Sequence, residues 1–321
     1  MSSGVSEPPG RRSQNPAELD RRGALRLGAA SVASFTAACA EPEEAPEPSS
    51  AQTSAAGGSP TTEAGTGDVE AATTESTTTA PSADLPPRED IVRRYAEHDP
   101  AAFGLEVPGV VLRHPGPGVA LTFDLCGGPQ GDQLDHDLWT LLQDHKVAST
   151  FFVNSRWLDA NPSLARELGA DPLIEIANHG HQHRPLSVDG RAAYGIRGTR
   201  DAGMAHDEVA EPVAALTDVG GTAPLWFRSG TAHCDDVGVR IAESLGQRVV
   251  NFSINGDAGA TFDAQQVSTD VGRAGDGGIV IAHANQPGSG TAAGLALALP
   301  ALLDRGVTFV GLADVLPSAA G

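Results

Sequence analysis

Basic residues are scarce in this 321-residue chain: 21 Lys and Arg stand against 41 Asp and Glu, which gives a formal net charge of −20. An acidic domain of this kind is repelled by nucleic acid phosphates and by anionic membrane surfaces. Long apolar runs are also missing, and no stretch of about 18 or more apolar residues follows residue 40. We therefore expect a soluble domain with no nucleic-acid partner and no transmembrane helix in that part.

The first 39 residues predict an export signal. Arg21 and Arg22 precede the short, weakly apolar run Leu27 to Ala38, a layout typical of a twin-arginine signal peptide and too short to span a bilayer. The run closes on Thr36-Ala37-Ala38-Cys39, which resembles a bacterial lipobox whose Cys is acylated. Cleavage after the triplet Ala38-Cys39-Ala40 would instead release the protein. We expect export to the cell envelope, either as a membrane-anchored lipoprotein or as a secreted protein.

Residues 40–87 have hardly any large aliphatic side chains and consist mainly of Ala, Glu, Pro, Ser, Thr and Gly. Such a segment buries too little apolar surface to offset the entropy that is lost on ordering. We predict a disordered linker for residues 40–87. Residues 88–321 then remain as one folded domain.

From Gly118 on, short apolar runs alternate with helix-like segments, which is the pattern of parallel strands joined by crossover helices. The sequence therefore predicts an α/β fold. We predict seven strands at Val119–Leu125, Ser149–Val153, Leu173–Ala177, Leu225–Arg228, Val249–Ile254, Ile279–His283 and Val307–Leu312. We predict helices at Asp132–His145, Pro162–Leu168, His206–Thr217, Asp235–Leu245, Asp263–Arg273 and Ala292–Leu303.

Three imidazoles lie in the segment from Asn178 to His183. His179 and His183 are four residues apart, so on a helical turn they face the same side and could hold a divalent metal together. A surface His cluster without a ligand fits the same spacing. The position directly after an apolar strand favours metal ligation. His181, two residues after His179, is expected to point elsewhere.

Three further polar residues end apolar runs, where the strand ends of a parallel barrel form one face. Asp124 is either a helix N-cap or a ligand or base in a pocket. His283 can act as a general acid near neutral pH, although a core His bonded to a backbone carbonyl fits as well. Arg228 needs a carboxylate partner if it is buried, and we choose Asp257.

Taken together, these segments resemble the polysaccharide deacetylase, or NodB-homology, carbohydrate esterases. The resemblance covers about residues 108–316 and includes five motifs in the family's order. The motifs are Thr122-Phe123-Asp124-Leu125-Cys126-Gly127, Asn178 with His179 and His183, Phe227-Arg228-Ser229-Gly230, Asn255-Gly256-Asp257, and Ile279 to His283.

The resemblance implies a distorted (β/α) barrel, similar to a TIM barrel, with about seven parallel strands. It implies a hydrolase that removes N-acetyl groups from an amino-sugar polymer of the cell envelope, peptidoglycan or a chitin-like glycan. His179 and His183 would bind a divalent metal, with zinc as the expected ion. Asp124 would be the general base and His283 the acid that protonates the leaving amine. Arg228 with Asp257 would tune Asp124.

One position departs from the family pattern. Leu125 stands where the family has a second Asp, the third metal ligand, and a Leu side chain cannot coordinate a metal. Asp124 could become the third ligand, or two His with waters could hold the metal more loosely. The third outcome is a non-catalytic glycan-binding lipoprotein of the cell wall. Hydrolysis of another amide on the same barrel also stays open. We expect retained activity, because base, His pair, Arg and acid are all present.

Cysteine is rare, and once Cys39 is used by the anchor or signal, Cys126 and Cys234 remain. Each could be a small buried hydrophobe. An even pair in an oxidising compartment favours a disulfide, and the family alignment places both residues on loops that border the pocket. We predict the bridge Cys126 to Cys234.

The walls of the pocket are harder to assign. The connection Arg191–Arg200, which contains Tyr194, either covers the pocket or is a solvated loop. Aromatic residues that could stack on sugar rings are few, with three Trp and two Tyr in the chain. Trp157 and Trp226 are the candidates, although Trp226 lies in a predicted strand and could belong to the core.

Overall fold

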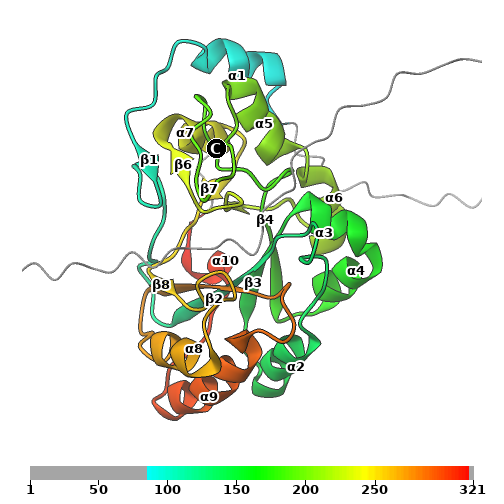
Figure 1. Ribbon diagram of the computed structural model, residues 1–321, viewed down its shortest axis with the longest axis vertical. Coiled ribbons are helices and arrows are strands. Elements are labelled where there is room, and N and C mark those ends of the chain that lie inside the picture. The colour runs from blue at the N-terminus through cyan, green and yellow to red at the C-terminus, as the bar shows by residue number, and fades with distance from the viewer. Residues whose placement is uncertain (1–84, 318–321) are drawn as a thin grey trace, which may run out of the picture. The chain divides into compact units, whose positions relative to one another are not determined.

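Seven parallel strands form the main sheet of the computed structural model, which describes residues 85–317 (Figure 1). Their order is β7-β5-β4-β3-β2-β9-β8, and the sheet curls into a half-barrel with β7 and β8 as its edges. The predicted α/β fold of the distorted-barrel type is thereby confirmed. The strands are β2 (Val119–Leu125), β3 (Ser149–Val153), β4 (Ile174–Asn178), β5 (Trp226–Phe227), β7 (Arg248–Val249), β8 (Ile254–Asn255) and β9 (Gly278–His283).

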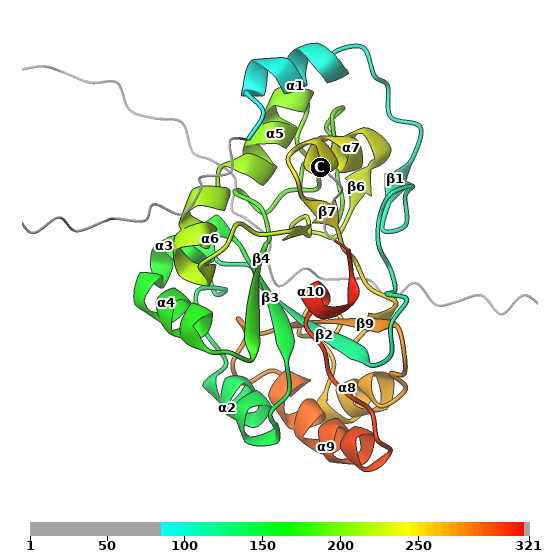
Figure 2. The same ribbon diagram turned by 180° about the vertical axis from the view of Figure 1, so that it is seen from behind.

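Helices α2, α4, α6, α8 and α9 pack on the sheet through one hydrophobic cluster, and α1, α5 and α7 form a second group near β7 (Figures 1 and 2). A short antiparallel pair, β1 (Phe103–Gly104) with β6 (Cys234–Asp235), lies near the second group. The helices are α1 (Arg88–Tyr95), α2 (His136–His145), α3 (Ser155–Ala160), α4 (Pro162–Ala170), α5 (Ala202–Ala210), α6 (Val213–Gly220), α7 (Asp236–Ser244), α8 (Ala264–Val271), α9 (Gly290–Asp304) and α10 (Leu312–Val315).

The helices that follow strands begin at polar N-caps. Asp135 accepts a hydrogen bond from the backbone N–H of Leu138 and so starts α2. Asn154 and Asp235 cap α3 and α7 in the same way, and Asp263 closes a capping box on α8. Each cap satisfies a backbone donor that has no partner inside the helix, which stabilises the helix by about 1 kcal/mol. The caps therefore fix where each crossover helix starts.

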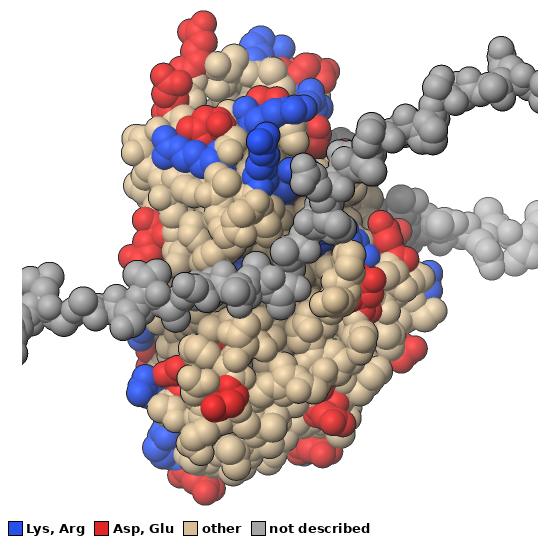
Figure 3. All heavy atoms as spheres, viewed as in Figure 1, with Lys and Arg blue, Asp and Glu red and all other residues tan. Residues whose placement is uncertain are grey.

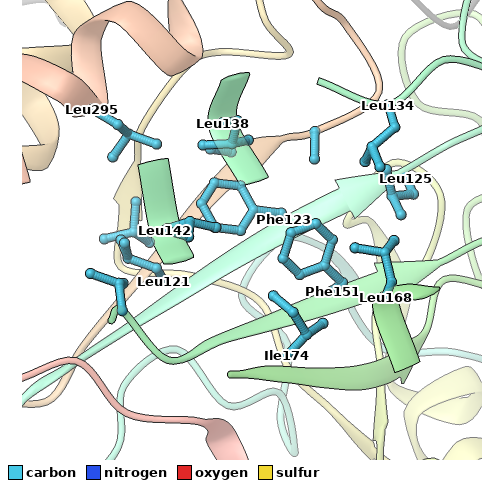
Figure 4. Close-up of a cluster of buried hydrophobic side chains, with 14 of the residues drawn as sticks. Leu121, Phe123, Leu125, Leu134, Leu138, Leu142, Phe151, Leu168, Ile174 and Leu295 are labelled. Atoms are coloured by element: carbon cyan, nitrogen blue, oxygen red, sulfur yellow. The ribbon is translucent and has the colours of Figure 1, made fainter. Parts of the chain in front are cut away.

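Strand β2 is buried along its whole length, as expected for a central parallel strand. Successive side chains point to opposite faces of the sheet. Leu121, Phe123 and Leu125 join the large cluster that also contains residues of α2, α4 and α9 (Figure 4). Ala120 packs on the other face, and by the same alternation Asp124 points there too. Leu125 is fully buried in the core, and Asp124 is left on the face that carries the polar groups described below.

Some predicted elements differ from the structure. The run Val249–Ile254 contributes to two short edge strands, β7 and β8, instead of one strand. Val307–Leu312 contains only an isolated bridge from Phe309 to Val119 before α10 begins. The predicted helix His206–Thr217 is divided into α5 and α6 near Pro212, whose ring removes a backbone donor. Helices α1, α3 and α10 were not predicted.

The predicted export signal (residues 1–39) and nearly all of the linker predicted for residues 40–87 lie outside the described residues. Helix α1 begins at Arg88, where the folded domain was expected to start. Within residues 85–317, no helix has the length and apolar character needed to cross a membrane. On the face shown in Figure 3, acidic side chains lie in small groups at both ends, and basic side chains gather near α1 and α5.

Candidate metal and catalytic site

The carboxyl ends of four parallel strands bring the predicted site residues together. Asp124 lies in the last part of β2, His179 follows β4, Arg228 follows β5, and His283 ends β9. In a parallel α/β sheet these ends share one edge, which is where ligands bind. The residues come from positions far apart in the sequence, and the register of the strands alone makes them neighbours.

Asp124 and Arg228 form a buried ion pair. Nη1 of Arg228 donates to Oδ1 of Asp124 at 2.8 Å, and both side chains are almost completely excluded from solvent. The other donors of Arg228 bond to Oγ1 of Thr122 at 2.9 Å and to the carbonyls of Val250 and Asn251 at 3.1 Å. The guanidinium is thus held rigidly, and it fixes the orientation of the Asp124 carboxylate.

Asp257 is not the partner of Arg228, so that predicted pairing is wrong. Its Oδ1 accepts a hydrogen bond from Nδ1 of His283 at 3.0 Å, and its Oδ2 accepts one from the backbone N–H of His283 at 2.6 Å. Thr291 and the backbone of Gly259 donate to the same carboxylate. Because Nδ1 of His283 is committed to Asp257, Nε2 is the ring nitrogen that can exchange a proton in the pocket.

The His179 to His183 segment is not a helical turn, contrary to the expectation from the four-residue spacing. It is a loop in which Gly180 and His183 have left-handed backbone conformations, with φ of 84° and 59°. A Cβ at position 180 would lie 2.4 Å from Oε1 of Glu208, so only Gly fits there. The two imidazoles are still adjacent, packed edge to face with ring centroids 4.9 Å apart. His181 points away, as predicted, and contacts Glu211 at 2.9 Å.

Two buried residues that the sequence analysis missed hold this loop. The carboxylate of Glu208 accepts the backbone N–H groups of Gln182 and Arg184 at 3.0 and 3.1 Å. Nδ2 of Asn154 donates to the carbonyls of His179 and Gly180 at 2.9 and 2.7 Å. Neither residue is marked by a local pattern, because each acts on a loop distant in the sequence.

The ring nitrogens of the two histidines fit a metal-binding role. Nδ1 of His179 donates to the carbonyl of Arg228 at 2.9 Å, which leaves Nε2 as the lone-pair nitrogen, a typical arrangement for a ligating His. Nε2 of His183 is buried and has no hydrogen-bond partner among the described residues. A buried polar atom of this kind needs an explanation, and a bound ion supplies one.

Cys126 is the third donor of this cluster and was not predicted as a ligand. Its Sγ lies 3.7 Å from Nε2 of His179, and the donor atoms of Cys126, His179 and His183 all lie within 4.8 Å of one another. The predicted disulfide is absent from the structure, where Sγ of Cys234 is buried 4.0 Å from the carbonyl of Gly104. The signal for Cys126 was its position two residues after Asp124, which places both side chains on one face of an extended chain.

Burial and neighbouring charges set the protonation of the site. Burial lowers the pKa of His179 and lowers that of His183 well below its ordinary value, so both rings are neutral near pH 7. Burial acts to raise the pKa of Asp124, but His179 and the Arg228 guanidinium outweigh it and the pKa is lowered. The cluster therefore presents two neutral imidazoles beside a carboxylate.

A pocket of about 880 Å³, including its open mouth, lies over this cluster. Asp124, Cys126, His183 and His283 contribute polar and titratable groups to its lining. Tyr194 lies on its wall, so the Arg191–Arg200 connection does border the pocket. Phe252, Ile196 and Ile281 add apolar surface. Trp157 and Trp226 are both fully buried in the core and are unsuited to stacking on a ligand.

Comparison with known proteins identifies the family. Residues 112–250, which include the ends of β2, β4 and β5, match the family model for polysaccharide deacetylases. The chain belongs to the polysaccharide deacetylase family. A search of curated protein sequences gave no match.

Solved structures of a peptidoglycan deacetylase and of family 4 carbohydrate esterases share the fold. A peptidoglycan N-acetylglucosamine deacetylase superposes with a TM-score of 0.54 at 21% identity, over 65% of this chain and 92% of that one. A family 4 carbohydrate esterase pseudoenzyme from Bacillus anthracis gives 0.55 at 19% identity, over 66% and 70%. PdaA of Bacillus subtilis, a family 4 carbohydrate esterase, gives 0.52 at 19% identity, over 71% and 87%. At these identities the likeness shows a common fold.

Proposed function

We propose that this chain is a metal-dependent deacetylase that removes N-acetyl groups from an amino-sugar polymer of the cell envelope, peptidoglycan or a chitin-like glycan. One observation carries the proposal. An ionised Asp124 lies 3.5 Å from Nε2 of His179, and the same pocket is lined by His283. A fixed carboxylate base and an imidazole acid beside a cluster of neutral metal-ligand groups are the parts that amide hydrolysis requires.

The residues present fit a divalent metal, and we propose zinc. His179 and His183 would hold it, because both rings are neutral and buried and the orphaned Nε2 of His183 would gain a partner. Zinc bound there would act as a Lewis acid on the amide carbonyl and would lower the pKa of water.

The protein groups account for the proton transfers. Asp124 takes a proton from the attacking water, whose oxygen bonds to the acetyl carbonyl carbon. Arg228 keeps the carboxylate oriented through its 2.8 Å hydrogen bond. His283, held by Asp257, gives a proton to the sugar nitrogen as the carbon–nitrogen bond breaks. The products are acetate and a free amino sugar.

The residues that line the pocket and the predicted export signal suggest the substrate class. Tyr194 and Phe252 in the pocket lining offer aromatic surface on which a sugar ring can stack, and the same lining supplies polar groups that can hydrogen-bond to it. The twin-arginine signal and acylation of Cys39 remain proposals, and together they would tether the domain near wall polymers. Hydrolysis of another amide would need the same base and acid but a different fit to these walls.

The test is acetate release by the full chain from purified peptidoglycan and from chitooligosaccharide. We expect release that is lost on treatment with a chelator and restored by zinc. A His283→Ala variant should bind zinc normally and release acetate at least about 100-fold more slowly.

A second candidate function is glycan binding without catalysis, because a structure with the same fold is described as a pseudoenzyme. Zinc-loaded protein that binds peptidoglycan in a pull-down but releases no acetate from any of these substrates would support this candidate and contradict the deacetylase proposal.

A further inference from the structure

We propose that Cys126 is a thiolate ligand of the metal, completing a Cys-His-His site with His179 and His183. This inference rests on the metal-dependent function proposed for the same site. A thiolate from Cys126 would replace the third metal ligand that Leu125 cannot supply. The Leu125 side chain is fully buried in the core cluster and points away from the pocket.

The distances match a zinc site. With Zn–S bonds of about 2.3 Å and Zn–N bonds of about 2.0–2.1 Å at tetrahedral angles, sulfur and nitrogen ligands lie about 3.6 Å apart. The observed distance from Sγ of Cys126 to Nε2 of His179 is 3.7 Å. The remaining separations in the cluster are at most 4.8 Å, so small side-chain rotations would close the set around an ion.

The sequence after β2 directs this thiol into the pocket. Thr122, Asp124 and Cys126 alternate along an extended chain, so they share a face. The chain then turns at Gly127, with φ of 70°, and a Cβ there would lie 2.3 Å from the backbone nitrogen of Trp157. Nη2 of Arg156 donates to the carbonyl of Cys126 at 3.2 Å. The turn at Gly127 and the hydrogen bond from Arg156 thus fix the backbone position of Cys126.

Hydrogen bonding distinguishes Cys126 from Asp124 as the third ligand. Oδ1 of Asp124 accepts from Arg228, which uses part of its ligand capacity. A thiolate carries the same single negative charge as a carboxylate, so the net charge of a carboxylate-His-His site would be kept. The thiolate is softer and favours zinc over magnesium, calcium and manganese. Asp124 then stays available as the base.

The experiment is zinc-edge X-ray absorption on the full-length chain with Cys39→Ser, which leaves two cysteines. We expect one sulfur neighbour at about 2.3 Å with nitrogen or oxygen neighbours at about 2.0–2.1 Å. Cys234→Ser is the matched control and should leave the sulfur signal unchanged. Cys126→Ser should remove it and weaken zinc binding at least about 100-fold in a chelator competition.

A second variant guards against a folding defect in the first. Cys126→Asp should bind zinc within about tenfold of the parent, without a sulfur neighbour, because a carboxylate replaces the thiolate. Zinc bound without sulfur in the parent chain, or zinc affinity unchanged in Cys126→Ser, would overturn the inference. Acetate release without zinc–sulfur coordination would leave the deacetylase proposal standing, and zinc–sulfur coordination without acetate release would leave the ligand assignment standing.

Discussion

Replacing Arg228 by Met should lower the free energy of unfolding by about 5 kcal/mol. Removing one partner of a buried ion pair costs about 3–5 kcal/mol, because the other charge is left uncompensated in the interior. Here Asp124 would keep only the 3.5 Å contact with His179 among the charged or titratable partners described above. The carbonyls of Val250 and Asn251 would also lose their donors, at about 1 kcal/mol or more each.

A loss of about 5 kcal/mol is a large part of the unfolding free energy of an ordinary domain, which is about 5–15 kcal/mol. Asp124→Asn should destabilise less on its own, because the Asn carbonyl can still accept a hydrogen bond from Arg228. The double variant Asp124→Asn/Arg228→Met should be more stable than the sum of the single effects predicts, by about 2–3 kcal/mol. This coupling arises because the double variant buries no unpaired charge.

Urea unfolding in the presence of a chelator gives the free energy of unfolding of the parent chain, the two single variants and the double variant. The three tryptophans of the chain, Trp139, Trp157 and Trp226, all lie in the described fold, so their fluorescence reports its unfolding. If the two single changes in unfolding free energy sum to that of the double variant within about 0.5 kcal/mol, the pairing is refuted, because substitutions at uncoupled sites add to this precision.

Two further predictions concern groups that support the site. Asp257→Asn should slow acetate release about 100-fold with little change in zinc content, because Nδ1 of His283 loses its charged acceptor. Burial raises the pKa of Glu208 from 4.5 to about 7. The folded chain therefore holds a proton that the unfolded chain releases, and the free energy of unfolding should fall from about pH 4.5 to about pH 7, by on the order of 3 kcal/mol. Glu208→Gln should flatten this slope, as urea unfolding at several pH values would show.

The sheet was predictable where a strand is long and buried on both faces. The bounds of β2 and β3 agree with the predicted runs, because both strands are mostly apolar and are buried along their whole length. Prediction failed at the edges of the sheet. Val249–Ile254 is as apolar as a strand, yet its two ends pair with different neighbours, β5 and β9. Local pattern carries no information about which distant strand will be adjacent.

In the candidate site, too, local sequence patterns were predictable and contacts between distant segments were not. Asp124, His179, Arg228 and His283 were found because each follows or ends an apolar run, and His183 was found through its four-residue spacing from His179. Their partners were not found reliably, because a partnership such as Asp257 with His283 depends on packing between elements. The spacing of His179 and His183 predicted a helix where Gly180 and the carboxylate of Glu208 impose a loop. Cys126 was assigned to a disulfide because composition favours pairs of cysteines and says nothing about an imidazole 3.7 Å away.

The most direct test of the account compares acetate release by the parent chain and by Asp124→Asn, loaded with zinc to the same measured content. If Asp124 is the base, turnover of chitooligosaccharide should fall by about 10²–10⁴-fold while zinc binding is retained. Unchanged turnover in Asp124→Asn would contradict the account. Loss of zinc in Asp124→Asn would contradict it as well, because Asp124 would then be a metal ligand.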